Sequence, residues 1–231
     1  MAWVGNTTEF APMTHFDLIE TRAKPIRPGF YARSGKRLLD LGLALLLLPL
    51  LAPVIALTWA AAKAQGGPGF YSHVRVGRHG RSFRCHKIRT MHPDADRLLR
   101  EHLRTHPLAA EEWARNRKLR HDPRVTPLGR ILRRTSLDEL PQILNVLRGE
   151  MSLVGPRPVT EDELGYYAPM PSTYLDQLPG VTGLWQVRGR RDGCYRTRVR
   201  LDRAYRREMS LATDLGLIGR TALALVRPSG C

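Results

Sequence analysis

Two adjacent carboxylates, Asp138 and Glu139, are the residues whose types are best suited to chemistry in this sequence. They follow Ser136 and lead into an apolar run, so the sequence predicts a helix over 137–148. The first turn of a helix has free N–H groups and a partial positive charge, which favour an ionised carboxylate and attract phosphate. Adjacent helical residues point about 100° apart. One acid could therefore attack phosphorus or hold a metal while the other handles a proton.

Helix capping explains the same pair without any chemistry. Ser136 followed three residues later by Glu139 is a capping-box pattern. Asp138 would then only complement the partial charge of the helix terminus. From these residues alone, capping and catalysis both remain open.

Basic residues on both sides of the pair favour a phosphate site. Arg130, Arg133 and Arg134 precede it, and Arg157 follows between two prolines. A rigid Pro-Arg-Pro turn presets a guanidinium for bidentate phosphate binding, although a surface arginine in a turn is the alternative. Two carboxylates that face a diphosphate need a counter-charge, and Mg²⁺ with oxygen ligands would supply it.

An apolar block lies upstream of the acids. No charged residue occurs from Leu41 to Ala62, and a straight helix of that length would span roughly 33 Å, enough for the hydrocarbon core of a membrane. Pro49 and Pro53 favour a sharp bend near its middle. Basic residues flank the block on both sides: Arg27, Arg33, Lys36 and Arg37 before it, and Lys63, Arg75, Arg78, Arg81 and Arg84 after it. This near-symmetry favours a re-entrant hairpin on the cytoplasmic face over a kinked spanning helix, which stays the alternative.

The remaining pattern predicts a mainly helical α+β protein with three parts. Residues 1–34 form a poorly ordered lead, 35–65 the membrane helix and 66–231 a small cytoplasmic catalytic domain. Within that domain, residues 70–91 read as a short β-hairpin. Helices are expected over 94–105, 109–120, 137–148 and 212–226. The last of these is apolar around most of its circumference, so it suits the membrane interface as an amphipathic helix, a buried core, or a second copy in a homodimer.

The charge balance limits the function classes. Lys+Arg 37 against Asp+Glu 21 gives a net charge of +16, which indicates an anionic partner such as phosphorylated substrates, an acidic membrane surface or nucleic acid. No helix-turn-helix, zinc or aromatic stacking motif supports nucleic acid. The 3 cysteines include no C-x-x-C pair and fit a reducing compartment. Two function classes fit these features: a membrane-tethered basic binding protein without catalysis, and a lipid diphosphate phosphatase.

A set of ordered motifs from about Ser34 to about Gly230 resembles the bacterial sugar transferases, also called monotopic phosphoglycosyl transferases, in their minimal single-anchor form. The motifs are Lys36-Arg37-Leu38-Leu39-Asp40, Arg75-Val76-Gly77, Phe83–Met91, Leu128-Gly129-Arg130, Ser136–Gln142, Asn145–Pro158, Pro179–Val187 and Leu201-Asp202.

The resemblance implies a helix that crosses one leaflet and is broken at Ala52-Pro53, with Pro49 as an additional proline. It implies transfer of a sugar 1-phosphate from a UDP-sugar to polyprenyl (undecaprenyl) phosphate, in the first membrane step of a glycoconjugate or exopolysaccharide pathway. Asp138 matches the nucleophile, which forms a covalent phosphosugar and releases UMP, and it is the expected Mg²⁺ ligand. Glu139 matches the second acid of the pair. The implied location is the phospholipid of the bacterial inner membrane, with the catalytic domain on its cytoplasmic face.

Four basic residues match family positions at the phosphate or nucleotide. They are Lys87, Arg133, Arg157 and Arg190. The last lies in Arg188-Gly189-Arg190, where the family has Asn-Gly-Arg, and Arg191 is a substitute in register.

Overall fold

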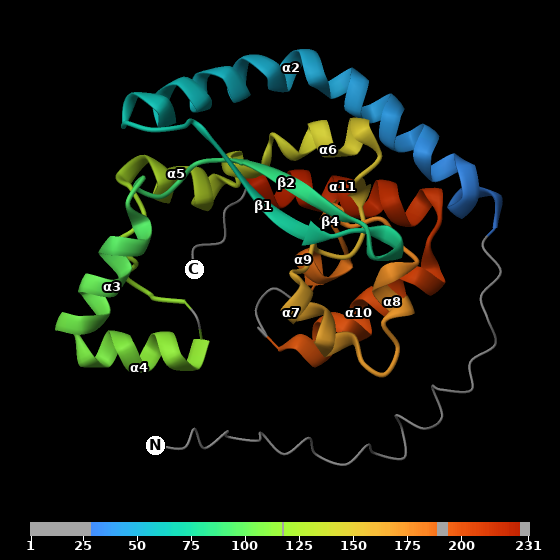
Figure 1. Ribbon diagram of the computed structural model, residues 1–231. Helices are drawn as coiled ribbons and strands as arrows, with labels where there is room; N and C mark the ends of the chain where they lie inside the picture. The colour runs from blue at the N-terminus through green and yellow to red at the C-terminus, as the bar shows by residue number, and fades with distance from the viewer. Residues whose placement is uncertain (1–28, 117, 189–193, 227–231) are drawn as a thin grey trace.

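The computed structural model describes residues 29–116, 118–188 and 194–226, and it shows a mainly helical α+β fold with two small sheets (Figure 1). The lead over 1–34 lies almost wholly outside this range. The elements are η1 (Tyr31–Gly35), α2 (Lys36–Ala64), β1 (Phe70–Val76), η2 (Arg78–Gly80), β2 (Ser82–Ile88), α3 (Ala95–Thr105), α4 (Pro107–Asn116), α5 (Pro127–Thr135), η3 (Leu137–Glu139), α6 (Gln142–Arg148), β3 (Ser152–Val154), α7 (Glu161–Leu164), η4 (Gly165–Tyr167), α8 (Ser172–Leu175), β4 (Gly180–Thr182), α9 (Leu184–Arg188), α10 (Tyr195–Glu208) and α11 (Leu211–Val226).

Helix α2 runs as an arch over the rest of the molecule (Figure 1). It stays helical through both prolines, so Pro49 and Pro53 lie inside one helix and do not break it in two. A proline removes one backbone donor and bends a helix there, but the turns on either side keep their own hydrogen bonds. Among the described residues, Tyr31–Ala64 is the one helix long and apolar enough to cross a membrane. Five of its leucines are strongly exposed: Leu38 near its start, and Leu45, Leu46, Leu50 and Leu57 further along.

Buried polar contacts fasten the first turns of α2 to the catalytic domain. The Lys36 Nζ lies 2.6 Å from Asp214 Oδ2 on α11 and donates to the Tyr205 hydroxyl at 2.9 Å. The Asp40 carboxylate accepts from the backbone N–H of Leu153, in β3, at 2.9 Å. These charged residues at the start of the apolar block therefore bind protein and not lipid.

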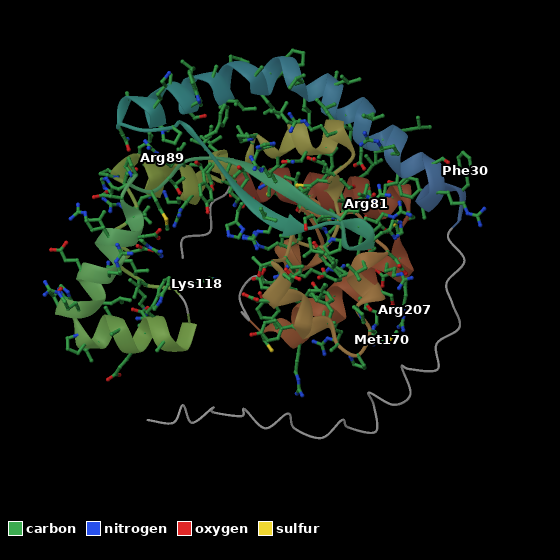
Figure 2. The ribbon with its side chains drawn as sticks, viewed as in Figure 1. Phe30, Arg81, Arg89, Lys118, Met170 and Arg207 are labelled. Atoms are coloured by element: carbon green, nitrogen blue, oxygen red, sulfur yellow. The ribbon has the colours of Figure 1, made fainter. Side chains whose placement is uncertain are left out.

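The last turns of α2 are fastened to the same domain. Trp59 and Ala62 pack in a cluster with Ile88 of β2 and with Leu137, the residue before the acids. The Arg89 guanidinium, labelled in Figure 2 near this end of the helix, donates to the carbonyl of Ala62 at 2.7 Å. Both ends of the arch thus contact one body of protein.

The predicted hairpin is confirmed. Strands β1 and β2 are antiparallel, and their register pairs Arg75 with Phe83 and Tyr71 with Lys87. Of the two helices predicted next, one needs adjustment. Helix α3 matches the expected 94–105, but α4 begins at Pro107 and ends at Asn116, where 109–120 was expected. Proline is favoured in the first turn of a helix because its missing N–H has no intrahelical partner there.

The acidic segment differs from the prediction. The expected helix over 137–148 is a 3₁₀ turn, η3, followed by the separate helix α6. Ser136 has φ 58° and makes no side-chain cap contact, so the predicted capping box is absent. Its N–H instead closes the end of α5 on the carbonyl of Arg133. The serine terminates one helix and does not start the next.

A second sheet was not foreseen. Strands β3 and β4 pair in parallel, with Ser152 opposite Gly180 and Val154 opposite Thr182. Two glycines allow the close approach that follows: a Cβ on Gly180 would lie 2.1 Å from the Gly155 nitrogen. The pair brings the Pro-Arg-Pro turn after β3 beside the loop that enters β4. Helix α11 spans the expected 212–226 segment, and its Leu217 is buried in a cluster with Tyr205.

Candidate active site

A pocket opens between the hairpin, the acidic turn and the Pro-Arg-Pro turn. It is lined by Arg75, Cys85, Lys87, Glu139, Gln142, Arg157, Pro158, Gly180, Val181 and Gln186. Three of these side chains are cations and one is a carboxylate. A pocket with excess positive charge suits an anionic ligand such as a diphosphate.

Lys87 links the two acids. Its Nζ donates to Glu139 Oε1 at 2.7 Å and lies 4.0 Å from Asp138 Oδ2. The Arg157 Nη1 lies 3.8 Å from the same Glu139 oxygen. The structure therefore brings together four residues that the sequence analysis singled out, from β2, the acidic turn η3 and the Pro-Arg-Pro turn.

Asp138 is buried, with a relative exposure of 7%. Burial raises the pKa of this carboxyl, Lys87 opposes that shift, and Glu139 adds to it. Desolvation therefore acts against the ionised form that a helix start was expected to favour. The acids lie in a 3₁₀ turn and not in the first turn of a long helix. Glu139 lines the pocket, whereas Asp138 is not among the lining residues.

One predicted residue, Arg133, lies elsewhere, and another falls outside the described residues. Arg133 is on α5 and its Nε donates to the Thr90 hydroxyl at 2.9 Å. It does not line the pocket, but its charge lowers the pKa of Asp138. Arg190 lies outside the described residues.

The sequence analysis did not assign Arg75 and Cys85 to the site. The hairpin register places both on the face that carries Lys87, because residues directly opposite each other share a face and alternate residues return to it. That alternation was the available signal. Cys85 is buried, which raises the pKa of its thiol. A protonated thiol is a poor nucleophile, so the carboxylates are the better candidates.

The donor set limits how a metal could be held. Within the described part of the chain, no group of three or more His, Cys, Asp or Glu side chains could hold a metal ion. Asp138 and Glu139 offer two carboxylates. Mg²⁺ is commonly bound by one or two carboxylates together with substrate phosphates and water. The residues present therefore fit Mg²⁺ if a phosphorylated substrate completes the coordination.

Comparison with known proteins identifies the family of the chain. Residues 31–228 match the family model described as bacterial sugar transferase. The exopolysaccharide production protein ExoY of Sinorhizobium fredii is 48% identical over 197 residues, which cover 85% of this chain and 87% of the relative. The undecaprenyl-phosphate galactose phosphotransferase of Salmonella typhimurium is 45% identical over 199 residues, 86% of this chain and 42% of that protein. The UDP-glucose:undecaprenyl-phosphate glucose-1-phosphate transferase of Caulobacter vibrioides is 41% identical over 200 residues, 83% of this chain and 69% of that protein.

The chain thus spans less than half of the Salmonella relative but most of ExoY. The matched range includes α2, the hairpin, the acidic turn and the pocket. With nearly the whole described chain matched by the family model, this protein belongs to the bacterial sugar transferase family and is a transferase.

Proposed function

We propose that the enzyme transfers a sugar 1-phosphate from a UDP-sugar to polyprenyl phosphate, with undecaprenyl phosphate as the acceptor, and releases UMP. The observation that carries the proposal is the acid pair held by Lys87 and Arg157 in a cationic pocket. The names of the Salmonella and Caulobacter relatives support the choice of acceptor, and that of the Caulobacter relative supports the donor. The ExoY relative supports a place in exopolysaccharide production, as the first membrane step.

The proposed chemistry has two displacements at one phosphorus atom. An Asp138 carboxylate oxygen attacks the sugar-linked phosphorus, the bond to the bridging oxygen breaks, and UMP leaves with that oxygen. The covalent aspartyl phosphosugar is then attacked by an oxygen of the polyprenyl phosphate. The bond to Asp138 breaks, the carboxylate is restored, and polyprenyl-diphosphate-sugar is formed. Burial of Asp138 supports this role because a poorly hydrated carboxylate has less water to lose before it attacks.

Lys87, Arg157 and Glu139 have roles around that phosphorus. The two cations offset the negative charge that spreads over the phosphoryl oxygens during transfer. Glu139 holds Lys87 in place through the 2.7 Å contact. We assign to its carboxylate a second role, to accept a proton or to help to bind a metal.

Asp138, with Glu139 beside it, would hold Mg²⁺ against the substrate diphosphate. When bound, the ion would supply charge neutralisation at the phosphate oxygens. The chain's own cations would still orient the diphosphate from the other side of the pocket.

The proposed location is the cytoplasmic face of the bacterial inner membrane, with α2 re-entrant. Lys36 at one end of α2 and Ala62 at the other are both bound to the same catalytic domain. A helix that spanned the bilayer would carry its two ends to opposite sides, so docking of both ends supports entry and exit through one face. The exposed leucines near the middle of the arch would then lie in the lipid.

Helix α11 offers a second apolar surface. Leu211, Leu215 and Leu223 are about half exposed. We place this amphipathic helix at the membrane interface, because its neighbour α2 carries the lipid-facing leucines. A homodimer that uses the same surface is the alternative.

The proposal is tested by trapping the covalent intermediate. The purified enzyme is incubated with a set of radiolabelled UDP-sugars and no lipid, and UMP and labelled protein are measured. We expect one sugar to give a labelled protein and stoichiometric UMP, and Asp138→Asn to abolish both. Asp96→Asn, an exposed acid in the first turn of α3, is the matched control and should label normally.

The two alternative functions predict different results. A lipid diphosphate phosphatase would release free phosphate from a polyprenyl diphosphate without an acceptor. A binding protein without catalysis would be indifferent to Asp138→Asn. Full turnover by that variant would show that Asp138 is not the nucleophile.

A further inference from the structure

Arg75 differs from the other two cations of the pocket in the partner that it contacts. Lys87 and Arg157 both approach the Glu139 carboxylate. The Arg75 Nη1 instead lies 3.1 Å from Glu163 Oε2, on helix α7, which does not line this pocket. Arg75 is therefore a pocket cation whose position is set from outside the acid pair.

Glu163 is itself held by several contacts. It closes a capping box with Thr160, whose backbone N–H donates to Glu163 Oε2 at 2.9 Å and whose hydroxyl accepts from the Glu163 N–H. The Tyr195 hydroxyl donates to the other carboxylate oxygen. Burial alone would raise the pKa of Glu163, but the hydrogen bonds from Tyr195 and Thr160 and the charge of Arg75 lower it overall. Glu163 is thus a fixed anion.

A fixed anion on one edge of a guanidinium orients the rest of the group. Arginine has five N–H donors in a planar fork. The contact with Glu163 engages Nη1 of Arg75, and Arg75 lines the pocket together with Lys87 and Arg157. The Arg75 side chain is 24% exposed, so a ligand can reach it.

We propose that Arg75 binds a phosphate group of the nucleoside diphosphate donor, and that Glu163 is the residue that positions it. The inference rests on the proposed function and adds a residue to its donor site. A planar fork suits two phosphate oxygens at once, and phosphate contacts by arginine are charge-assisted and directional. Orientation before binding lowers the entropy that the ligand contact would otherwise lose.

Tyr195, the first residue of α10, joins the Arg75–Glu163 pair to that helix. Its ring stacks on Tyr166 with centroids 4.2 Å apart and planes 24° apart. The guanidinium carbon of the buried Arg198 lies over the Tyr195 ring, 5.3 Å from its centroid, and Arg198 Nη2 donates to the carbonyl of Arg157 at 2.6 Å. One network therefore supports both pocket arginines, Arg75 and Arg157.

The competing role for the Arg75–Glu163 pair is structural, since it also joins α7 to the hairpin. The two roles are distinguished by comparing the affinities for two ligands, one that carries phosphates and one that does not. Full-length protein in nanodiscs is titrated with UDP and with uridine, by calorimetry and by ligand-observed NMR. We expect Arg75→Gln to weaken UDP at least about tenfold and to leave uridine within about twofold. Arg75→Lys should lose less.

Arg81→Gln is the matched control. Arg81 is exposed at the tip of the same hairpin and labelled in Figure 2, and it does not line the pocket. It should bind both ligands like the wild type. Glu163→Gln keeps the Arg75 charge but releases it, so UDP affinity should fall several-fold. The double variant Arg75→Gln/Glu163→Gln should be no weaker than Arg75→Gln alone, because Glu163 acts through Arg75.

Equal UDP affinity in Arg75→Gln and the wild type would overturn the inference, as would proportional losses for UDP and uridine. Additive losses in the double variant would remove the positioning role of Glu163. If Arg75→Gln does not fold, Arg75→Lys and Glu163→Gln decide the question by the same UDP comparison. Absence of UDP binding by the wild type would instead overturn the proposed function.

Discussion

Lys36, in the first turn of the membrane helix, forms a buried ion pair with Asp214 of α11, with 2.6 Å between Nζ and Oδ2. The Tyr31 and Tyr205 hydroxyls also donate to this carboxylate. The pair is the principal polar joint between α2 and the far end of the described chain.

Removal of one partner should destabilise the protein strongly. In Lys36→Met the Asp214 carboxylate stays buried without its cation, and loss of one partner of a buried pair costs about 3–5 kcal/mol. We expect a clear fall in the thermal midpoint in detergent. Lys118→Met, in an exposed loop, should melt like the wild type. Lys36→Met/Asp214→Leu should recover much of the loss, and a double variant as unstable as the single would contradict this account.

The rate of covalent labelling should depend on the protonation of Asp138. Burial raises the pKa of this carboxyl and Lys87 lowers it. The reactive form is the carboxylate, so labelling should fall as pH drops through a pKa above the ordinary aspartate value. Lys87→Gln removes the opposing charge and should move this acidic limb to higher pH. Labelling rates measured across pH, with Arg81→Gln as control, test this, and an unmoved limb in Lys87→Gln would contradict the coupling.

The backbone contact between the glycines beneath the pocket should tolerate no side chain. A Cβ on Gly180 would lie 2.1 Å from the Gly155 nitrogen and 2.4 Å from the Thr182 oxygen. Backbone must move to admit it, so Gly180→Ala should separate β3 from β4 and lower the thermal midpoint sharply. Gly165→Ala meets nothing within 4 Å and should be nearly neutral. Similar thermal midpoints for the two variants would show that the close approach of Gly155 and Gly180 contributes little to stability.

Both ends of α2 should be on the same side of the membrane. In a background without Cys194 and Cys231, single cysteines are placed at the exposed positions Ser34 and Gln65. A membrane-impermeant maleimide should reach neither in intact cells and both in inside-out vesicles, because both ends dock on one domain. Labelling of Ser34→Cys but not Gln65→Cys from outside would indicate a spanning helix.

Local rules of sequence accounted for several parts of this protein. The uncharged block from Leu41 to Ala62 predicted the long apolar helix, because only a membrane or a deep core accommodates such a run. Two short strand-like segments around a turn within 70–91 predicted the hairpin, whose strands pair as neighbours in the chain. The spacing of the ordered motifs identified the family, which the family match confirmed. The acid pair and its nearby cations also predicted a phosphate site, since their residue types alone suit phosphate chemistry.

Contacts between distant residues decided the rest. Ser136 appeared to start a helix, but its left-handed backbone ends α5 and places the acids in a 3₁₀ turn. Asp138 appeared to be favoured as an anion, yet the packing around it raises its pKa through desolvation. The pairing of β3 with β4 and the contact of Arg75 with Glu163 join segments far apart in the chain. The sequence by itself determined which residues can do chemistry and which segment is apolar. Tertiary structure decided how those residues are charged and oriented, because burial and long-range pairing depend on neighbours that local patterns do not contain.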